Sequence, residues 1–162
     1  MKPLSLDSLD IGLLLSALAG KAETSLGRRK SEDADLADSH AGCMERYQVV
    51  QELWALWEEQ ERLPLSGVLD VSDPVGRSQR GIRLLPGELI QVRDSVLAMQ
   101  GLRRWVDDRA GRCPALMLRA GLMEIDPFLC SSLGRSFDED GGFSGREYPQ
   151  LEELRNRQVE LR

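Results

Sequence analysis

Apolar residues in this chain recur at helical spacing, in segments that proline and glycine separate. From Asp7 or Ser8, both good N-caps, to Ala22 they fall at i, i+3, i+4, i+7 and i+11, as on one buried helix face. A second helix is predicted over 39–62 and ends where Pro64 interrupts the hydrogen-bond ladder. Its apolar stripe carries Cys43, Tyr47, Val50, Trp54 and Trp57. This spacing favours an all-α fold.

Proline marks the start of most later helices. The predicted helices are 73–81, 85–111, 114–120, 126–134 and one that begins at Pro149. The polar segment 28–38 predicts a loop or a solvated helix start, after a turn at 25–27. Aromatic residues make up only 5% of the chain and leucine supplies most of the apolar bulk, which favours helices over a β-sandwich. The residues expected in the core are Leu14, Leu18, Val50, Trp54, Trp57, Val92 and Val96.

One short β-hairpin is predicted near 137–143, because Phe137 and Phe143 flank an Asp/Gly turn. The helix that follows carries Leu151, Leu154 and Leu161 on one face and reaches Arg162 without a glycine, asparagine or proline to end it. We therefore expect this helix to be the first turns of a longer element and the chain to be cut.

Charge and cysteine usage narrow the classes of function. The net charge of −6 argues against a surface that binds nucleic acid over its whole extent. Three cysteines, Cys43, Cys113 and Cys130, lie far apart, which indicates buried thiols in a reducing compartment. The N-terminus is not a secretory signal and no apolar run approaches membrane-spanning length, so we expect a cytoplasmic protein without a membrane partner.

Residue types that carry chemistry are few. His40, the only histidine, forms a His-x-x-Cys pair with Cys43, but no spacing supplies the other ligands of a structural zinc. The acids at 138–140 do not match a calcium loop, since the twelfth position is Pro149. No lysine follows Lys30, so a Walker-type ATP site is excluded. We expect no catalytic, cofactor or metal site here, and retain an enzyme that uses Asp138–Asp140 with a metal as an open alternative.

Three arginines, Arg77, Arg80 and Arg83, fall within seven residues and are candidates for contacting phosphate. No aromatic is interleaved with them, as single-strand binders usually have. A solvated face balanced by nearby acids is the competing interpretation.

Taken in order, several segments resemble the N-terminal region of the MutS-two branch of the MutS DNA-repair proteins. The central pattern is a Leu-Pro-Leu-x-Gly loop at 63–67, a short helix from Asp70 to Gly81, and Leu-x-x-x-Glu-Leu at 84–89. Near the end, 137–141 is similar to the family's Asp-x-x-Gly turn and 149–151 to the entry of its lever helix. The match covers 5–27 and 63–162, and 28–62 only by helical character. Gly145-Arg146-Glu147-Tyr148 departs from the family's Asp-Ser-Ala-Ser.

The resemblance implies part of a MutS-type helical core over 1–162. Its parts would be N-terminal helices (5–62), central helices (63–134), a hairpin and turn (135–148) and the start of the lever helix (149–162). Intact relatives would be dimeric ATPases acting on branched or recombining DNA, or on stalled ribosomes. Their ATP and magnesium sites, clamp and nuclease would lie downstream of Arg162, so this chain would not itself be an enzyme.

Two functions of different class follow. In the first, the chain couples the ATPase of such a DNA-repair and recombination or ribosome-rescue protein to its lever and clamp. In the second, it is a stand-alone helical interaction module that dimerises or docks on a full-length relative, since a core without its neighbours exposes apolar surface. DNA or a ribosome would be reached only through the parent protein.

Overall fold

The computed structural model describes residues 10–35, 37–138 and 141–160, and eight helices lie within these ranges. They are α1 (Ile11–Ala19), α2 (Ser25–Glu32), α3 (His40–Glu58), α4 (Ser72–Gln79), α5 (Pro86–Asp107), α6 (Pro114–Ala120), α7 (Pro127–Ser136) and α8 (Pro149–Glu160). The all-α prediction is confirmed. The predicted starts of the first helix at Asp7 or Ser8, and the calls on Asp140, Leu161 and Arg162, lie outside the described residues.

The predicted β-hairpin is not confirmed, because the described residues contain no strand. An isolated antiparallel bridge joins Phe137 to Phe143 instead. The two rings stack at 5.1 Å, and Tyr148 meets Phe143 edge-on at 5.9 Å. The Ser136 hydroxyl and the Tyr148 hydroxyl lie 3.0 Å apart. A small aromatic cluster, rather than a sheet, therefore turns the chain from α7 towards α8.

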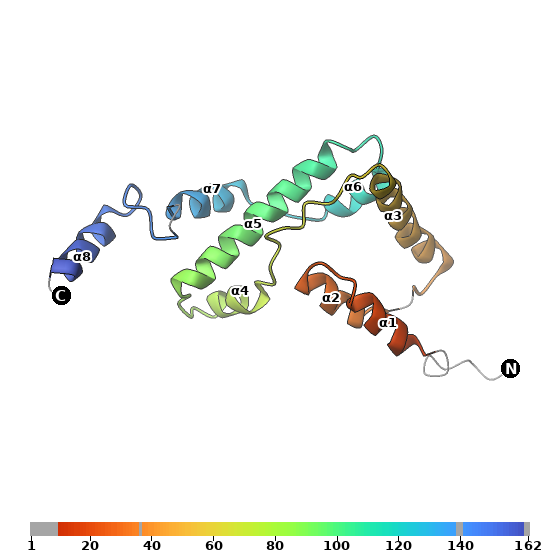
Figure 1. Cartoon of the computed structure of the whole chain (residues 1–162), viewed down its shortest axis with the longest axis horizontal. Helices are drawn as coiled ribbons and strands as arrows, with labels where there is room; N and C mark the ends of the chain where they lie inside the picture. Colours follow the sequence, from red (N-terminus) through yellow and green to blue (C-terminus); the bar gives the residue numbers. More distant parts are fainter. Residues whose placement is uncertain (1–9, 36, 139–140, 161–162) are drawn as a thin grey trace.

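The long helix α5 organises the molecule, since α4, α6 and α7 all pack on it. α3 packs on α6, and α1 packs on α2. Figure 1 shows the helices strung along one axis, with α8 at one end and the α1–α2 pair and α3 at the other. The accessible surface of the chain is 12612 Å². A compact monomer of 18.1 kDa exposes about 8,100 Å², so this arrangement is open.

Helix starts follow the sequence signals closely. Pro86, Pro114 and Pro127 stand at the first position of their helices, as predicted. The Ser39 hydroxyl accepts a hydrogen bond from the Gly42 N–H at 3.1 Å and so starts α3. The carboxylate of Glu88 accepts one from the Leu85 N–H at 2.8 Å and fixes the first turn of α5.

Several helix boundaries were predicted wrongly, among them the ends of α3, at Glu58 instead of 62, and of α5, at Asp107 instead of 111. Residues 25–27 form the first turn of α2 rather than a separate turn, because the Thr24 hydroxyl accepts from the Gly27 N–H at 3.0 Å and caps a helix there. α4 begins at Ser72, one residue before Asp73. α7 continues through Gly134 to Ser136, since a single glycine weakens a helix without ending it.

The predicted core is also wrong. Leu14, Leu18, Val50, Trp54 and Trp57 are exposed, and Val92 and Val96 are half-buried. α6 packs beside the face of α3 that carries Val49 and Glu52, so the face with Val50, Trp54 and Trp57 stays uncovered. The only helix that packs on α1 is the short α2, among the described helices. The buried apolar residues are Ala19, Leu56, Val106, Cys113, Ala120, Cys130 and Phe137. Among the described helices, none combines the length and the apolar character that crossing a membrane requires.

Candidate functional site

The end of α3 is a tight turn that projects two carboxylates towards α5. Gln60 adopts the left-handed conformation, with φ 63°. Its N–H donates to the Trp57 carbonyl at 2.9 Å, and the N–H of Glu61 donates to the Leu56 carbonyl at 2.9 Å. This pair of bonds is the Schellman arrangement that commonly ends helices. It fixes the direction in which the side chains of Glu59 and Glu61 leave the backbone.

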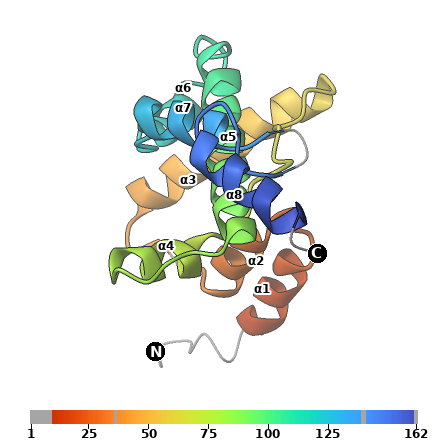
Figure 2. The same ribbon diagram turned by 90° about the vertical axis from the view of Figure 1, so that its left-hand side faces the viewer.

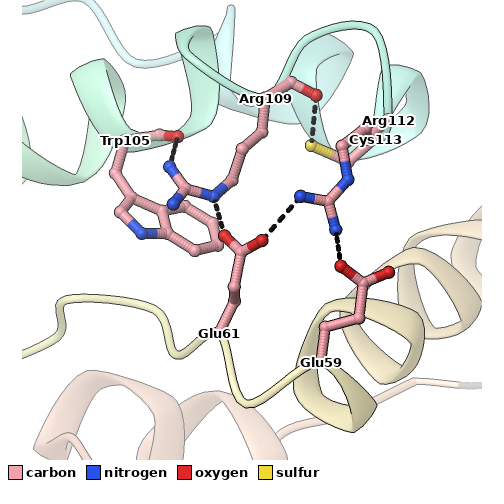
Figure 3. Close-up of polar contacts among 6 residues, drawn as sticks. All are labelled: Glu59, Glu61, Trp105, Arg109, Arg112 and Cys113. Carbon is pink, nitrogen blue, oxygen red and sulfur yellow. Dashed lines mark hydrogen bonds and ion pairs between the residues drawn. The ribbon is translucent and has the colours of Figure 1, made fainter.

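Two arginines from the turn between α5 and α6 meet these carboxylates (Figure 3). Arg109 donates from Nε to one oxygen of Glu61, and Arg112 donates from Nη1 to the other at 2.6 Å. Arg112 also donates to Glu59. The result is an ion-pair network of Glu59, Glu61, Arg109 and Arg112, which joins segments about fifty residues apart in sequence.

Further contacts orient the arginine side of the network. The Arg109 guanidinium lies 4.0 Å from the centre of the Trp105 ring and donates to the Trp105 carbonyl at 3.0 Å. The Cys113 thiol donates to the Arg109 carbonyl at 3.1 Å. Arg109 is therefore stacked and hydrogen-bonded before it reaches Glu61, so the network is pre-oriented from the α5 side (Figure 3).

The pKa values of Glu61 and of the neighbouring Cys113 thiol are both shifted from their ordinary values. Hydrogen bonds, first from Arg112 and then from Arg109, lower the pKa of Glu61 below its ordinary value. Burial, more than any other cause, raises the pKa of the Cys113 thiol. Glu61 is thus held ionised, whereas Cys113 is held as a neutral thiol. Both states suit a structural joint, and neither supplies a nucleophile at neutral pH.

An apolar groove of about 300 Å³ lies beside the network. Trp54 and Trp57 of α3 meet edge-on at 5.0 Å, and the Arg62 guanidinium lies 4.9 Å from the centre of the Trp57 ring. Two members of the network region, Glu61 and Trp105, also line the groove. The remaining lining residues are Glu23, Val50, Leu53, Leu56, Leu63 and Leu65. The network and the tryptophan groove therefore form one site between the end of α3 and the turn that follows α5.

A second polar tie connects α3 to α6. The two oxygens of the Glu52 carboxylate accept hydrogen bonds from the backbone N–H groups of Ala115, at 2.9 Å, and Leu116, at 2.7 Å. These are donors that the first turn of α6 leaves without helical partners. A side chain of α3 therefore caps α6, and it does so without a capping residue from the α6 sequence itself.

The three arginines predicted to contact phosphate, Arg77, Arg80 and Arg83, lie in different surroundings. Arg77 lies between Asp73 and Glu88 and pairs with both, which ties α4 to the start of α5. The hydrogen bond to Glu88 is the largest cause of a raised pKa for Arg77. Arg80 and Arg83 lie exposed at the end of α4 and in the loop after it. Two of the three candidates thus face solvent.

The candidates for metal chemistry are dispersed. His40 begins α3, and Cys43 is exposed one turn later, contrary to its predicted burial. Cys113 and Cys130 are buried, as predicted. Asp138 accepts a hydrogen bond from the Gly142 N–H at 2.7 Å, which fits a turn residue. Within the described ranges, no three His, Cys, Asp or Glu side chains come together as metal ligands.

Sequence reasoning did not find the network. The sequence patterns gave no role to Glu59, Glu61, Arg109 or Arg112. Nothing in one sequence pairs charges that are separated by fifty residues.

The structure thus defines an extended all-α protein whose ion-pair network joins the end of α3 to the turn between α5 and α6. The chain is 28% identical to the endonuclease MutS2 of Symbiobacterium thermophilum over 151 residues, 93% of this chain and 19% of that protein. It is 25% identical to the endonuclease MutS2 of Alkaliphilus oremlandii over 108 residues, 67% of this chain and 14% of that protein. No family model and no solved structure matches.

These similarities support a MutS2-like relationship, as the resemblance of its motifs predicted. The chain spans less than a fifth of the length of either of these relatives.

Proposed function

We propose that this chain is the N-terminal helical core of a MutS2-like protein and acts there as a mechanical connector. In this role it transmits the nucleotide state of an ATPase domain to a lever and clamp that grip DNA or a ribosome. The lever would begin at α8. The chain itself would supply no ATP, magnesium or nuclease site.

The observation that carries this proposal is a set of polar ties between helices. The ion-pair network joins the end of α3 to the turn between α5 and α6, the Glu52 carboxylate joins α3 to α6, and Arg77 joins α4 to the start of α5. A connector must pass displacement between distant elements, and packed helices cross-linked by polar contacts are suited to this. That these helices are arranged as in a MutS-type core is part of this proposal.

The first test is the mass of the protein captured from its own cells by antibody and measured intact. A species far larger than 18.1 kDa supports the connector. A species at this mass would overturn it.

The second test uses the larger protein with dyes on α3 and α8. Changing Glu61→Gln together with Arg112→Gln should reduce the nucleotide-dependent change in energy transfer. The matched control is Glu45→Gln with Arg119→Gln, an exposed pair between α3 and α6 whose closest atoms are 3.6 Å apart. An equal effect of both double variants would contradict a specific role for the network.

A second candidate function is supported by the exposed apolar stripe of α3. Tyr47, Val50, Trp54 and Trp57 are 44–57% exposed, and they follow the 3-4-3 spacing of residues that face a partner helix. A stand-alone module that dimerises or docks on a full-length relative would cover this stripe. Sedimentation of the purified 162-residue chain tests it. A monomer over the micromolar range, with no binding to a full-length relative, would exclude this function.

A further inference from the structure

Every tryptophan of the chain lies on one apolar surface. The sequence holds three tryptophans, and all of them, Trp54, Trp57 and Trp105, line the tryptophan groove. Val50, Trp54 and Trp57 also belong to the exposed stripe of α3, so the groove and the stripe are continuous. The stripe and the residues that line the groove are together named the tryptophan face. A partner that lies along α3 therefore reaches the groove as well.

The rings of the tryptophan face are held in position by contacts within the chain. The Trp54 indole N–H donates to the Glu58 carboxylate at 2.9 Å, one turn further along α3. The centre of the Trp57 ring lies 5.0 Å from the centre of the Trp54 ring and 4.9 Å from the Arg62 guanidinium carbon. Fixed side chains lose little entropy on binding, and tryptophan is enriched among the residues that dominate the energy of interfaces.

The charge around the tryptophan face is negative in excess. Glu23 lines the groove from the segment between α1 and α2, a pair that both views place below α3 (Figures 1 and 2). Glu61 is balanced by two arginines, whereas within the described ranges no cation pairs with Glu23 or with Glu58. Among the described lining residues, Arg62 is the one cation, and it lies over a ring. Positive charge on a partner is therefore complementary to this face.

We propose that the tryptophan face binds a basic amphipathic helix of another polypeptide. The apolar side chains of such a helix, spaced i, i+3 or i+4 and i+7, lie along the stripe and enter the groove, and its cations face Glu23 and Glu58. A second copy of this chain is a poorer occupant, because each copy carries a net charge of −6 and the two repel. The proposal rests on the second candidate function and adds the chemistry of the partner.

The test uses two synthetic helices that differ only in charge. Each has about 14 residues, or four turns, with the same leucine stripe and no tryptophan; one carries lysine and the other glutamate beside the leucines. Each is titrated into the full 162-residue chain while tryptophan emission is recorded, and anisotropy of a dye on the peptide measures binding independently. The basic helix should shift the emission to shorter wavelength, because the exposed rings of Trp54 and Trp57 lose water.

The charge of the partner is tested by affinity. At about 50 mM salt the basic helix should bind roughly tenfold more tightly than the acidic one, and the difference should shrink at about 500 mM, where exposed charges are screened. Glu23→Gln should weaken binding of the basic helix about threefold. The matched control is Glu124→Gln, an exposed acid between α6 and α7, which should leave the affinity unchanged.

The position of the partner is tested by a pair of apolar substitutions. Val50→Ser, at an exposed position of the stripe, should weaken the basic helix about tenfold, since an apolar contact is lost. Leu122→Ser changes an exposed leucine of a different groove, between α3 and α6, and should leave the affinity unchanged. Circular dichroism should show equal helix content in all variants.

Four results would overturn the proposal. They are equal affinity for the acidic helix, binding without a change in tryptophan emission, an equal effect of Leu122→Ser and Val50→Ser, and no binding of the basic helix at about 1 mM. Sedimentation of the same samples separates the proposal from the second candidate function. A dimer of the chain that Val50→Ser dissociates would make a second copy the occupant; the basic partner would then be wrong, and the second candidate function would stand.

Discussion

Gln60 holds a conformation that costs a residue with a side chain about 1 kcal/mol or more. The other described residues with positive φ are Asp10 and three glycines, Gly67, Gly81 and Gly141. We expect Gln60→Gly to raise the free energy of unfolding by about 0.5–1 kcal/mol, because relief of strain exceeds the entropy that glycine adds to the unfolded chain. Urea denaturation measures this. Gln60→Ala keeps the strain and should give no gain; equal stabilisation by both would contradict the explanation.

Ser95 is a polar residue with no exposed surface, in the middle of α5. Its hydroxyl donates to the Leu69 carbonyl at 3.1 Å and accepts from the Leu69 N–H at 3.3 Å, which fixes the segment before α4 on α5. Ser95→Ala should lower the free energy of unfolding by about 1–3 kcal/mol, because two backbone groups lose their partner. Thermal denaturation tests it against Ser78→Ala at an exposed position, and equal losses would refute it.

Single residues show why the site was not predictable. Whether a side chain is buried depends on which other helix packs against it, and a single sequence does not show which helix that is. Trp54 and Trp57 were placed in the core by their spacing, whereas the structure has them at the wall of a groove. Glu61 had no feature that separated it from the other acids at the end of α3.

At the scale of elements, the cap of α6 by α3 gives a sharp prediction. Glu52→Ala should lower the free energy of unfolding by about 1–2 kcal/mol, as the loss of an N-cap does. Chemical denaturation followed by far-ultraviolet circular dichroism measures it. Glu45→Ala removes a carboxylate from the same helix whose nearest guanidinium nitrogen is 3.6 Å away, so it should cost less than about 0.5 kcal/mol. A larger loss for Glu45→Ala would show that the cap is not the source.

Most elements could be predicted, because their signals are local. Pro86, Pro114, Pro127 and Pro149 each begin a helix where the sequence indicated one. For α2 the sequence left open a loop or a solvated helix start at 28–38 and placed a turn at 25–27, because the cap, Thr24, precedes a polar stretch without apolar periodicity. The packing of α3 on α6 was not predictable, since the cap that joins them is a long-range contact.

For the whole molecule, three carboxylates with lowered pKa values make the free energy of unfolding depend on pH. The pKa of Glu61 is lowered by Arg112 and Arg109, that of Asp70 chiefly by Ser72, and that of Glu88 by the Leu85 N–H and Arg77. A lowered pKa means that the unfolded chain binds protons first as the pH falls. Stability should therefore be retained above about pH 5 and fall progressively below about pH 4.

Urea midpoints at pH 7, 5, 4 and 3 measure this dependence. Glu61→Gln should show a shallower decline than the wild type, since it cannot take up a proton. Glu153→Gln, which changes an exposed acid of α8, should decline as the wild type does. A midpoint that rises between pH 5 and pH 3 would contradict the direction of all three shifts.

The extent of exposed surface in this open arrangement could not be predicted from the sequence. Amphipathic spacing predicted helices with a buried face, but it did not state how many of these faces would be covered. The total surface of 12612 Å² shows that many are not.

The isolation of α8 has a consequence for its exchange of hydrogen with solvent. Among the described helices, none packs on α8, and a helix of 12 residues is marginal in water by itself. Its amide protons should therefore exchange with deuterium within seconds at neutral pH, whereas those in the middle of α5, the helix on which three others pack, should persist far longer. Slow exchange throughout α8 would reveal a neighbour that holds it. A deuterium label on this one helix would thus report when it acquires a partner.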